Sequence, residues 1–381
     1  MGFVSTFDKH RIETGKSLDG YLKECRLALG SAIACRHKVY LDTKYWLLLR
    51  NNRLGRLNDP VIAKVSALLH KGARDAKLIC PISAEVFLEI LKQTDPVTLR
   101  CSIELIDALS EGVSLLAPQE RVRMELLYFA LRNMFGDSSC HSPEIFVWTK
   151  LAYVLGFMSF YNTPFSLEEE LTAQKVFLDQ MWQITLTEMV QKIGFESFSE
   201  KSRLAHTSGE LNTGKFAHAD ENSSYEETFL SEIAGILEIL KPEFVEMISY
   251  LHEKFVAKVL SKQEIPASEE AQQLANIVYH GFRLKRFSTE LPSLRVPAAL
   301  HAAIRWETKR KYKQGDAYDI QNATAALPYF DTFLTENSLR HLLTRNDLAL
   351  DSLYNCTVIS DPKRAIPEIE KTISQSGKGE L

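Results

Sequence analysis

The first third of the chain alternates short apolar runs with longer runs of helical periodicity. Apolar positions recur at helical spacing over residues 16–34, and a short apolar run follows at 39–41. A second run, AKLICPIS, precedes another helical pattern, SAEVFLEILKQT, and a third strand is expected within VSLLAP. Strands that alternate with helices in this way predict a parallel sheet of the α/β class.

The pattern changes in the middle of the chain, where long helical periods dominate. Within it, residues 197–225 are poor in apolar side chains and rich in Ser, Asn, Gly and charge, which predicts an exposed loop of disordered composition. Strand and helix patterns return near the end: helices over PAALHAAIRWETKRKYKQ, DAYDIQNATAAL and NSLRHLLTR, and strands in FDTFLT and CTVIS. We therefore expect an α/β domain that is interrupted by a mostly α-helical insertion.

The expected organisation has four parts. They are an N-terminal helical segment, the first part of the α/β domain, the helical insertion, and the second part of the α/β domain with a C-terminal tail: residues 1–35, 36–118, 119–295 and 296–381.

Composition and charge narrow the class of protein. With 45% hydrophobic and 25% charged residues the chain has ordinary globular composition. Its net charge of −4 means that any nucleic-acid binding would depend on a local basic patch. The six cysteines form no CxxC pair, which favours reduced thiols over a zinc site. Without a signal peptide or a run of about 20 apolar residues, we expect a cytoplasmic protein that does not associate with membranes.

Several carboxylates stand where an α/β sheet collects ligands. Asp42 ends the first strand, Glu89 lies on the helix after the second, and Asp316 and Asp319 open a late helix one turn apart. Ligands of open parallel sheets bind at the carboxyl ends of the strands. Two carboxylates 4 Å apart repel by about 4 kcal/mol at an effective dielectric constant of 20. Mg²⁺ or Mn²⁺, which prefer oxygen ligands, would relieve this repulsion and activate a water.

Each acid also has a simpler interpretation. Asp42 and Asp316 have the positions of helix caps, and Asp331 has that of a turn residue before a strand. Glu89 alone would more often be a solvated helix residue. Glu85, four residues earlier, is more readily structural than a ligand.

The order of these motifs resembles that of the PIN-domain ribonucleases. The matching stretches are VYLDTKYW, ISAEVFLEIL, DAYDIQNATAA and FLTEN, within residues 36–118 and 296–361. The resemblance implies metal-dependent cleavage of RNA phosphodiesters, with Asp42, Glu89 and Asp319 as catalytic metal ligands.

The chain departs from the family pattern at two positions. Lys44 stands where the family usually has Asn, and Asn337 where it has the last Asp. Asp331 or the adjacent Glu336 would supply the missing carboxylate, or Asn337 would hold a water or metal through its carbonyl. Thr335 would orient a metal-bound water or simply end the strand.

Basic residues precede the late acids. Arg305, Lys309, Arg310, Lys311 and Lys313 suit a phosphate backbone, and the side chains of Trp306 and Tyr312 suit base stacking. The alternative is a solvated face of an amphipathic helix.

The hypothesis is a Mg²⁺- or Mn²⁺-dependent endoribonuclease. Asp316 and Asp331 would support the metal ligands, and in-line attack of water would leave a 3′-hydroxyl and a 5′-phosphate. Two alternatives stay open: a non-catalytic scaffold of the same fold that binds RNA or protein through the insertion, and a plain helical adaptor. The expected partners are RNA, an inhibitory or activating protein, and a second copy of the chain. The setting, whether toxin–antitoxin, phage defence or RNA processing, stays open too.

Overall fold

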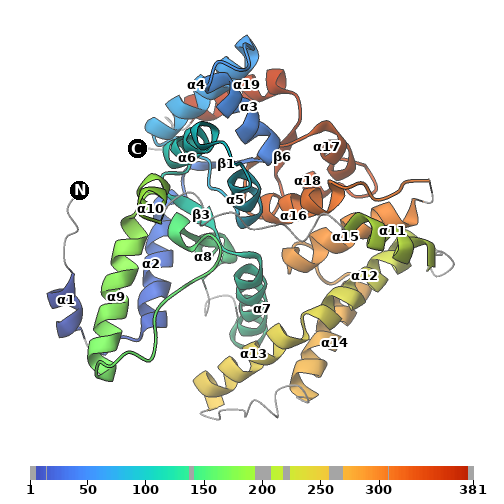
Figure 1. The fold of residues 1–381 in the computed structure, drawn as a ribbon. Helices are drawn as coiled ribbons and strands as arrows, with labels where there is room; N and C mark the ends of the chain where they lie inside the picture. The colour runs from blue at the N-terminus through green and yellow to red at the C-terminus, as the bar shows by residue number, and fades with distance from the viewer. Residues whose placement is uncertain are drawn as a thin grey trace.

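A small parallel sheet forms the centre of the structure, which is a computed structural model (Figure 1). The structure describes residues 6–13, 15–136, 141–193, 207–217, 224–256, 269–307 and 309–375. The four strands lie in the order β2-β1-β5-β6 and every neighbouring pair is parallel: β1 (His37–Leu41), β2 (Leu78–Ile79), β5 (Thr332–Leu334) and β6 (Thr357–Ile359). The expected α/β class is therefore confirmed, and the sheet joins segments from both ends of the chain.

The strands are short apolar runs because they are buried in a sheet that helices flank. Val39, Tyr40 and Leu41 are each about 1% exposed. Eight helices follow or precede these strands: α3 (Thr43–Arg53), α4 (Pro60–Arg74), α5 (Ala84–Leu91), α6 (Pro96–Ser110), α16 (Asp316–Ala326), α17 (Asn337–Leu343), α18 (Leu350–Leu353) and α19 (Pro362–Gln375).

Local signals fix where several of these helices begin. Ser83 caps α5 as the sequence predicts, since its hydroxyl accepts from the backbone N–H of Val86. A proline occupies the first turn of α4, where a missing N–H costs nothing. Helix α19 was expected only as a tail; instead it packs against α4 and buries Ala365 and Ile369.

A second, two-stranded sheet corrects the prediction for residues near 148. Strand β3 (Val113–Leu115) lies in the predicted strand VSLLAP and pairs antiparallel with β4 (Trp148–Lys150). The residues of β4 were expected to be helical. Only the single turn α8 (Pro143–Phe146) and a 3₁₀ turn (Leu151–Tyr153) are helical there. The apolar run of this stretch fits either state by periodicity alone, and pairing with β3 decides for the strand.

Helices make up most of the remainder. They are α1 (Phe7–Ile12), α2 (Leu18–Ile33), α7 (Pro118–Phe135), α9 (Leu167–Gln183), α10 (Leu186–Ile193), α11 (Thr207–Ala217), α12 (Tyr225–Ile239), α13 (Lys241–Leu251) with a π-helical turn (His252–Val256), α14 (Glu269–Arg283) and α15 (Pro292–Trp306). Helix α11 lies inside the stretch 197–225 that was expected to be a loop, so that expectation is wrong for residues 207–217. Residues 197–206 and 218–223 lie outside the described part.

The long helical periods of the middle region are interrupted at two places. Ile184 is extended and ends α9 before α10 begins. Pro242 stands in the first turn of α13 and separates it from α12. A proline cannot continue a helix that precedes it, because its ring clashes with the preceding turn.

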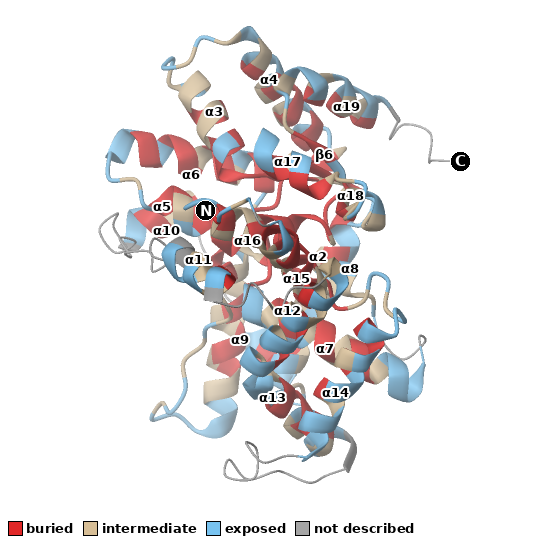
Figure 2. Ribbon diagram, turned by 90° about the vertical axis from the view of Figure 1, so that its right-hand side faces the viewer, coloured by how far each residue is buried: buried red, intermediate tan, exposed pale blue. Residues whose placement is uncertain are grey.

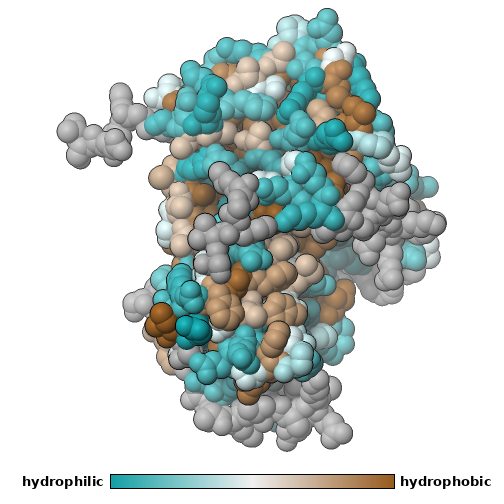
Figure 3. Space-filling model, turned by 60° about the vertical axis from the view of Figure 1, so that its left-hand side comes forward, coloured by the Kyte–Doolittle hydropathy of each residue, from teal (hydrophilic) through white to brown (hydrophobic). Residues whose placement is uncertain are grey.

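Buried residues gather around the four-stranded sheet, α15 and α16 (Figure 2). A second hydrophobic cluster joins α7 to α12, α13 and α14, and a smaller one joins α2 to α9. Helix α15 belongs to two clusters: Leu300 packs in the cluster of the sheet, and Leu294 in that of α7. On the face in Figure 3, hydrophobic side chains occur in separate groups among hydrophilic ones. Within the described ranges no helix combines the length and hydrophobicity needed to cross a bilayer.

Candidate carboxylate site

Asp42 lies at the carboxyl end of β1. Its backbone N–H donates to the carbonyl of Leu334 at 3.0 Å, which places it beside the end of β5. Its carboxylate accepts from the N–H of Tyr45 at 3.1 Å and so caps α3. The cap interpretation is correct, and it leaves the other carboxylate oxygen for a second role.

The Asp42 carboxyl is unusually hard to ionise. It is 5% exposed, and burial raises its pKa to about 6. The Thr335 hydroxyl, the Tyr45 N–H and the Lys44 charge lower the pKa, whereas the charge of Glu336 raises it. A buried acid with a nearby acid is the electrostatic condition under which a cation would be stabilised.

The pKa of Asp319 is raised by several other acids. This residue lies in the first turn of α16 and is partly buried. Burial raises its pKa to about 7, and four carboxylates add to the increase in the order Glu336, Asp316, Asp42 and Glu89. Asp316 lies on the same helix, whereas Glu336, Asp42 and Glu89 come from other elements, so the fold brings these three charges within electrostatic reach of Asp319.

Glu89 reaches this region from α5. Its carboxylate accepts a hydrogen bond of 2.5 Å from the Thr43 hydroxyl, and Thr43 directly follows Asp42. This bond joins α5 to the start of α3 beside the end of β1. The structure therefore places Glu89 against the residue that follows Asp42, and the charges of both acids lie within electrostatic reach of Asp319.

The chain after β5 supplies the remaining groups. Thr335 is fully buried, and its hydroxyl has no hydrogen-bond partner of regular geometry among the described residues, although it lies near enough to Asp42 to lower that pKa. A buried hydroxyl left in this way is typical of a position that a ligand or water completes. Glu336 follows, partly exposed, and accepts from the Ser338 hydroxyl. Asn337 is exposed and accepts from the Ser360 hydroxyl at 3.2 Å.

The donor atoms suit a hard divalent cation, because they are carboxylate and hydroxyl oxygens. As the side chains lie, no three His, Cys, Asp or Glu residues of the described ranges stand close enough to hold a metal ion. Binding of a cation here would therefore require the carboxylates to lie closer together than they do in this structure.

Asp331 does not belong to the cluster, which corrects the expectation from sequence. Its carboxylate accepts from the backbone N–H of Lys38 at 2.7 Å, and its own N–H donates to the Lys38 carbonyl at 3.0 Å. Lys38 begins β1 and Asp42 follows its end. Because β1 and β5 are parallel, a residue before β5 lies at the opposite end of the sheet from Asp42.

Asp316 and Glu85 have structural roles. The Asp316 carboxylate is buried and accepts from the backbone N–H of Lys313 at 2.9 Å and from Arg310 at 3.3 Å. Glu85 forms a buried ion pair of 2.8 Å with Arg121 of α7. Asp316 still acts on Asp319 through its charge, whereas Glu85 faces the helical region.

The basic residues divide into paired and exposed ones. Arg305 forms an ion pair with Glu232 of α12, so its guanidinium already has a carboxylate partner. Arg310 is held by Asp316. The helix expected over this stretch ends at Trp306, and the lysines that follow are exposed on an irregular segment: Lys309, Lys311 and Lys313.

Only one of the two expected stacking residues is available. Trp306 is 43% exposed. Tyr312 is 5% exposed, and its hydroxyl lies 2.9 Å from Nδ1 of His301, so its ring cannot stack on a base. Tyrosine often occupies such positions, since its ring packs while its hydroxyl finds a partner.

Sequence reasoning missed a cation next to the acids. Lys92 donates to the Tyr318 hydroxyl at 3.0 Å, with its ammonium 4.8 Å from the centre of that ring. Tyr318 immediately precedes Asp319, and Lys92 lies three residues after Glu89. The signal was the spacing of three residues from Glu89, which places Lys92, the residue that follows α5, on the same side of the helix as Glu89.

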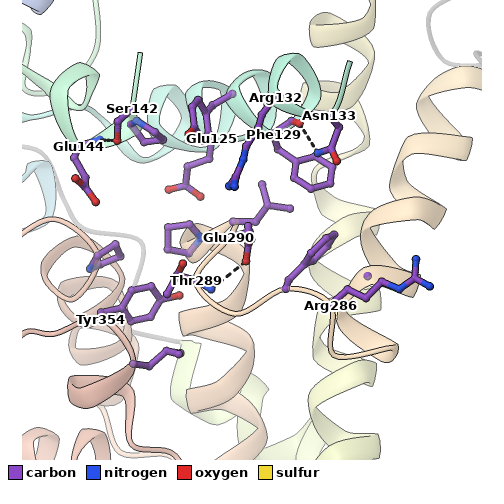
Figure 4. A pocket seen from close by; sticks show the side chains of 18 of the residues that line it. Glu125, Phe129, Arg132, Asn133, Ser142, Glu144, Arg286, Thr289, Glu290 and Tyr354 are labelled. Carbon is purple, nitrogen blue, oxygen red and sulfur yellow. Dashed lines mark hydrogen bonds between the residues drawn. The ribbon is translucent and has the colours of Figure 1, made fainter. Parts of the chain in front are cut away.

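A large hollow lies elsewhere, between α7, α14 and the turn before α15 (Figure 4). It has a volume of about 1000 Å³, and Glu125, Glu290 and Tyr354 are among its lining residues. Glu125 caps α15, since it accepts from the N–H and hydroxyl of Ser293 at 2.9 and 2.6 Å. Glu290 accepts from the N–H groups of Ser288 and Thr289. These carboxylates already stabilise a helix end and a turn, which leaves the strand-end cluster as the stronger candidate.

Comparison of the chain with family models, curated proteins and solved structures finds no match of any of the three kinds.

Proposed function

We propose that the chain is a metal-dependent endoribonuclease that hydrolyses RNA phosphodiester bonds. The proposal is supported by three observations: Asp42 follows the carboxyl end of β1, Glu89 accepts a hydrogen bond from the adjacent Thr43, and the charges of Asp42, Glu89 and Glu336 raise the pKa of Asp319 although these residues are far apart in the chain. The motif order that resembles the PIN-domain ribonucleases favours the same reaction. Structural ion pairing does not account for the cluster, because all four groups are acids.

Asp42, Glu89 and Asp319 would hold Mg²⁺ or Mn²⁺, with Glu336 in the place first given to Asp331. A bound divalent ion would stabilise charge on a phosphoryl oxygen and lower the pKa of water. The exposed lysines beside the cluster would hold the phosphates of the RNA backbone. Hydrolysis in line with the scissile bond would leave a 3′-hydroxyl and a 5′-phosphate.

The test uses one acid of the cluster and one from the opposite end of the sheet. Purified wild type is incubated with a mixed RNA pool and Mn²⁺, with a chelator in a parallel reaction. We expect Asp319→Asn to lower cleavage by about 1000-fold or more, because a metal ligand is lost. Asp331→Asn is the matched control and keeps wild-type activity. Cleavage that survives both the chelator and Asp319→Asn would refute the mechanism.

A second candidate is a scaffold that binds RNA without cutting it. It is favoured by Asn337 and Lys44 at two motif positions and by the absence, among described residues, of three acids within metal-holding distance. RNA binding by wild type without cleavage under any metal condition would select this alternative. The parallel sheet argues against the third one, a plain helical adaptor.

A further inference from the structure

The segment 307–315 connects α15 to α16, and its described residues, 307 and 309–315, have no regular secondary structure. The segment carries the exposed lysines and leads directly into the turn that holds Asp319. Among its described residues the internal backbone hydrogen bonds are few; one joins the N–H of Arg310 to the carbonyl of Glu307 at 3.0 Å. A segment of this kind would be mobile unless other elements held it.

Lys215 of helix α11 holds the beginning of the segment. The side chain is 5% exposed, and its ammonium donates to the carbonyls of Ile304 at 2.7 Å, Glu307 at 2.6 Å and Arg310. All three N–H donors of the ammonium are therefore used. A cation at the last carbonyls of a helix is also favoured by the helix dipole, here that of α15.

Asn212, one turn earlier on α11, holds the end of the segment. Its amide nitrogen donates to the carbonyl of Tyr312 at 2.9 Å, and its amide oxygen accepts from the N–H of Tyr312 at 2.8 Å. The side chain thus satisfies both backbone groups of one residue, as a neighbouring strand would. Beside it, the ammonium of Lys311 lies 5.7 Å from the ring of Phe216.

These bonds lead to the carboxylate cluster. Lys313 and Arg310, on either side of Tyr312, both donate to Asp316 in the first turn of α16. No side chain caps that helix. Helix α11 packs against α16 and lies beside it in both views (Figures 1 and 2).

We propose that α11 acts as a clamp, in which Asn212 and Lys215 are positioning residues for the segment between α15 and α16. The clamp holds the lysines of that segment beside the carboxylate cluster, so that an RNA backbone can contact the lysines and the cluster together. These lysines are Lys309, Lys311 and Lys313. The inference rests on the proposed function, which names the substrate. The proposal gives helix α11, which lies in the long region between the two parts of the sheet domain, a role in positioning the lysine-bearing segment.

The test separates the clamp from the nuclease. The variants are Asn212→Ala, Lys215→Met and Lys215→Arg, and the control is Thr213→Ala, whose hydroxyl donates only within α11, to the Gly209 carbonyl at 3.0 Å. Amide hydrogen exchange of full-length protein reports whether the clamp exists. We expect exchange at the Tyr312 amide to rise about tenfold or more in Asn212→Ala and to stay unchanged in the control.

The functional readouts are RNA cleavage and RNA affinity. In Lys215→Met we expect KM for a short RNA to rise about tenfold while kcat falls less, with partial recovery in Lys215→Arg. RNA affinity measured by fluorescence anisotropy in an Asp319→Asn background should fall by a similar factor.

The outcomes are distinct. Unchanged Tyr312 exchange in Asn212→Ala overturns the clamp. Faster exchange with unaltered KM and RNA affinity overturns the positioning role while the nuclease stands. If wild type cleaves no RNA but Lys215→Met still weakens RNA binding, the nuclease fails and the clamp is supported as part of a binding surface.

Discussion

At the scale of single residues, the carboxylates of the cluster repel one another in the absence of a cation. The pKa of Asp319 is raised from 3.8 to about 7. Between these two values the folded protein binds more protons than the unfolded chain, so this group makes the fold less stable as the pH rises, and the loss is complete above about pH 7.

Asp319→Asn should therefore stabilise the metal-free protein at neutral to alkaline pH. We expect the free energy of unfolding to rise by about 1 to 2 kcal/mol near pH 8, and by less near pH 5, because the wild-type carboxyl is then mostly protonated. Urea unfolding at both pH values, with chelator present, measures the difference. A variant less stable than wild type near pH 8 would mean that Asp319 mainly serves the local structure.

The residue positions were partly predictable from sequence. Asp42 follows a strand, Glu89 lies on the helix after the next strand and Asp319 lies in the first turn of a helix, so their elements could be predicted, and in the structure the charges of Asp42 and Glu89 reach Asp319. Asp331 was misplaced because proximity to a strand in sequence does not say at which end of the sheet a residue lies. Tyr312 was misjudged because the sequence does not reveal the His301 partner that keeps its ring inside.

At the scale of elements, helix starts with a side-chain cap or a proline were predictable, and elements defined by distant partners were not. Strand β4 forms because it pairs with β3, and α11 forms hydrogen bonds with the segment after α15. Neither partner is close in the chain. Local propensity is a weak guide where tertiary contacts decide.

The close packing of α2 against α8 can be tested at a glycine in their contact. A Cβ added at Gly30 of α2 would lie 1.9 Å from the carbonyl oxygen of Ile145 in α8. We expect Gly30→Ala to lower the free energy of unfolding by about 1 to 3 kcal/mol, because the two helices must move apart. Gly235→Ala in α12 is the control, since nothing lies within 4 Å of its Cβ, and it should stabilise by about 0.5 to 1 kcal/mol. Equal effects of the two substitutions in thermal melts would contradict the packing argument.

At the scale of the whole molecule, a buried ion pair joins the sheet region to the helical region. Arg121 of α7 is 2% exposed and pairs with Glu85 of α5. Loss of one partner from a buried pair leaves the other charge buried and unpaired.

Arg121→Met should therefore lower the free energy of unfolding by about 3 to 5 kcal/mol. Arg123→Met is the control, because Arg123 and its partner Glu246 are about half exposed, and it should cost less than about 1 kcal/mol. Chemical denaturation followed by circular dichroism gives both values. A loss below about 1 kcal/mol for Arg121→Met would show that the two regions do not depend on this pair.

The pairing of β1 with β5 has a consequence for how the protein is made. β1 ends at residue 41 and β5 begins at residue 332, so roughly 290 residues must be synthesised before the two strands can meet. At about 5 to 20 residues per second, the ribosome needs on the order of 15 to 60 s for that length. During this time the edge of β1 that will face β5 has no partner, and Asp319 and Glu336 have not yet been made. The carboxylate cluster therefore cannot form until almost the whole protein has been synthesised.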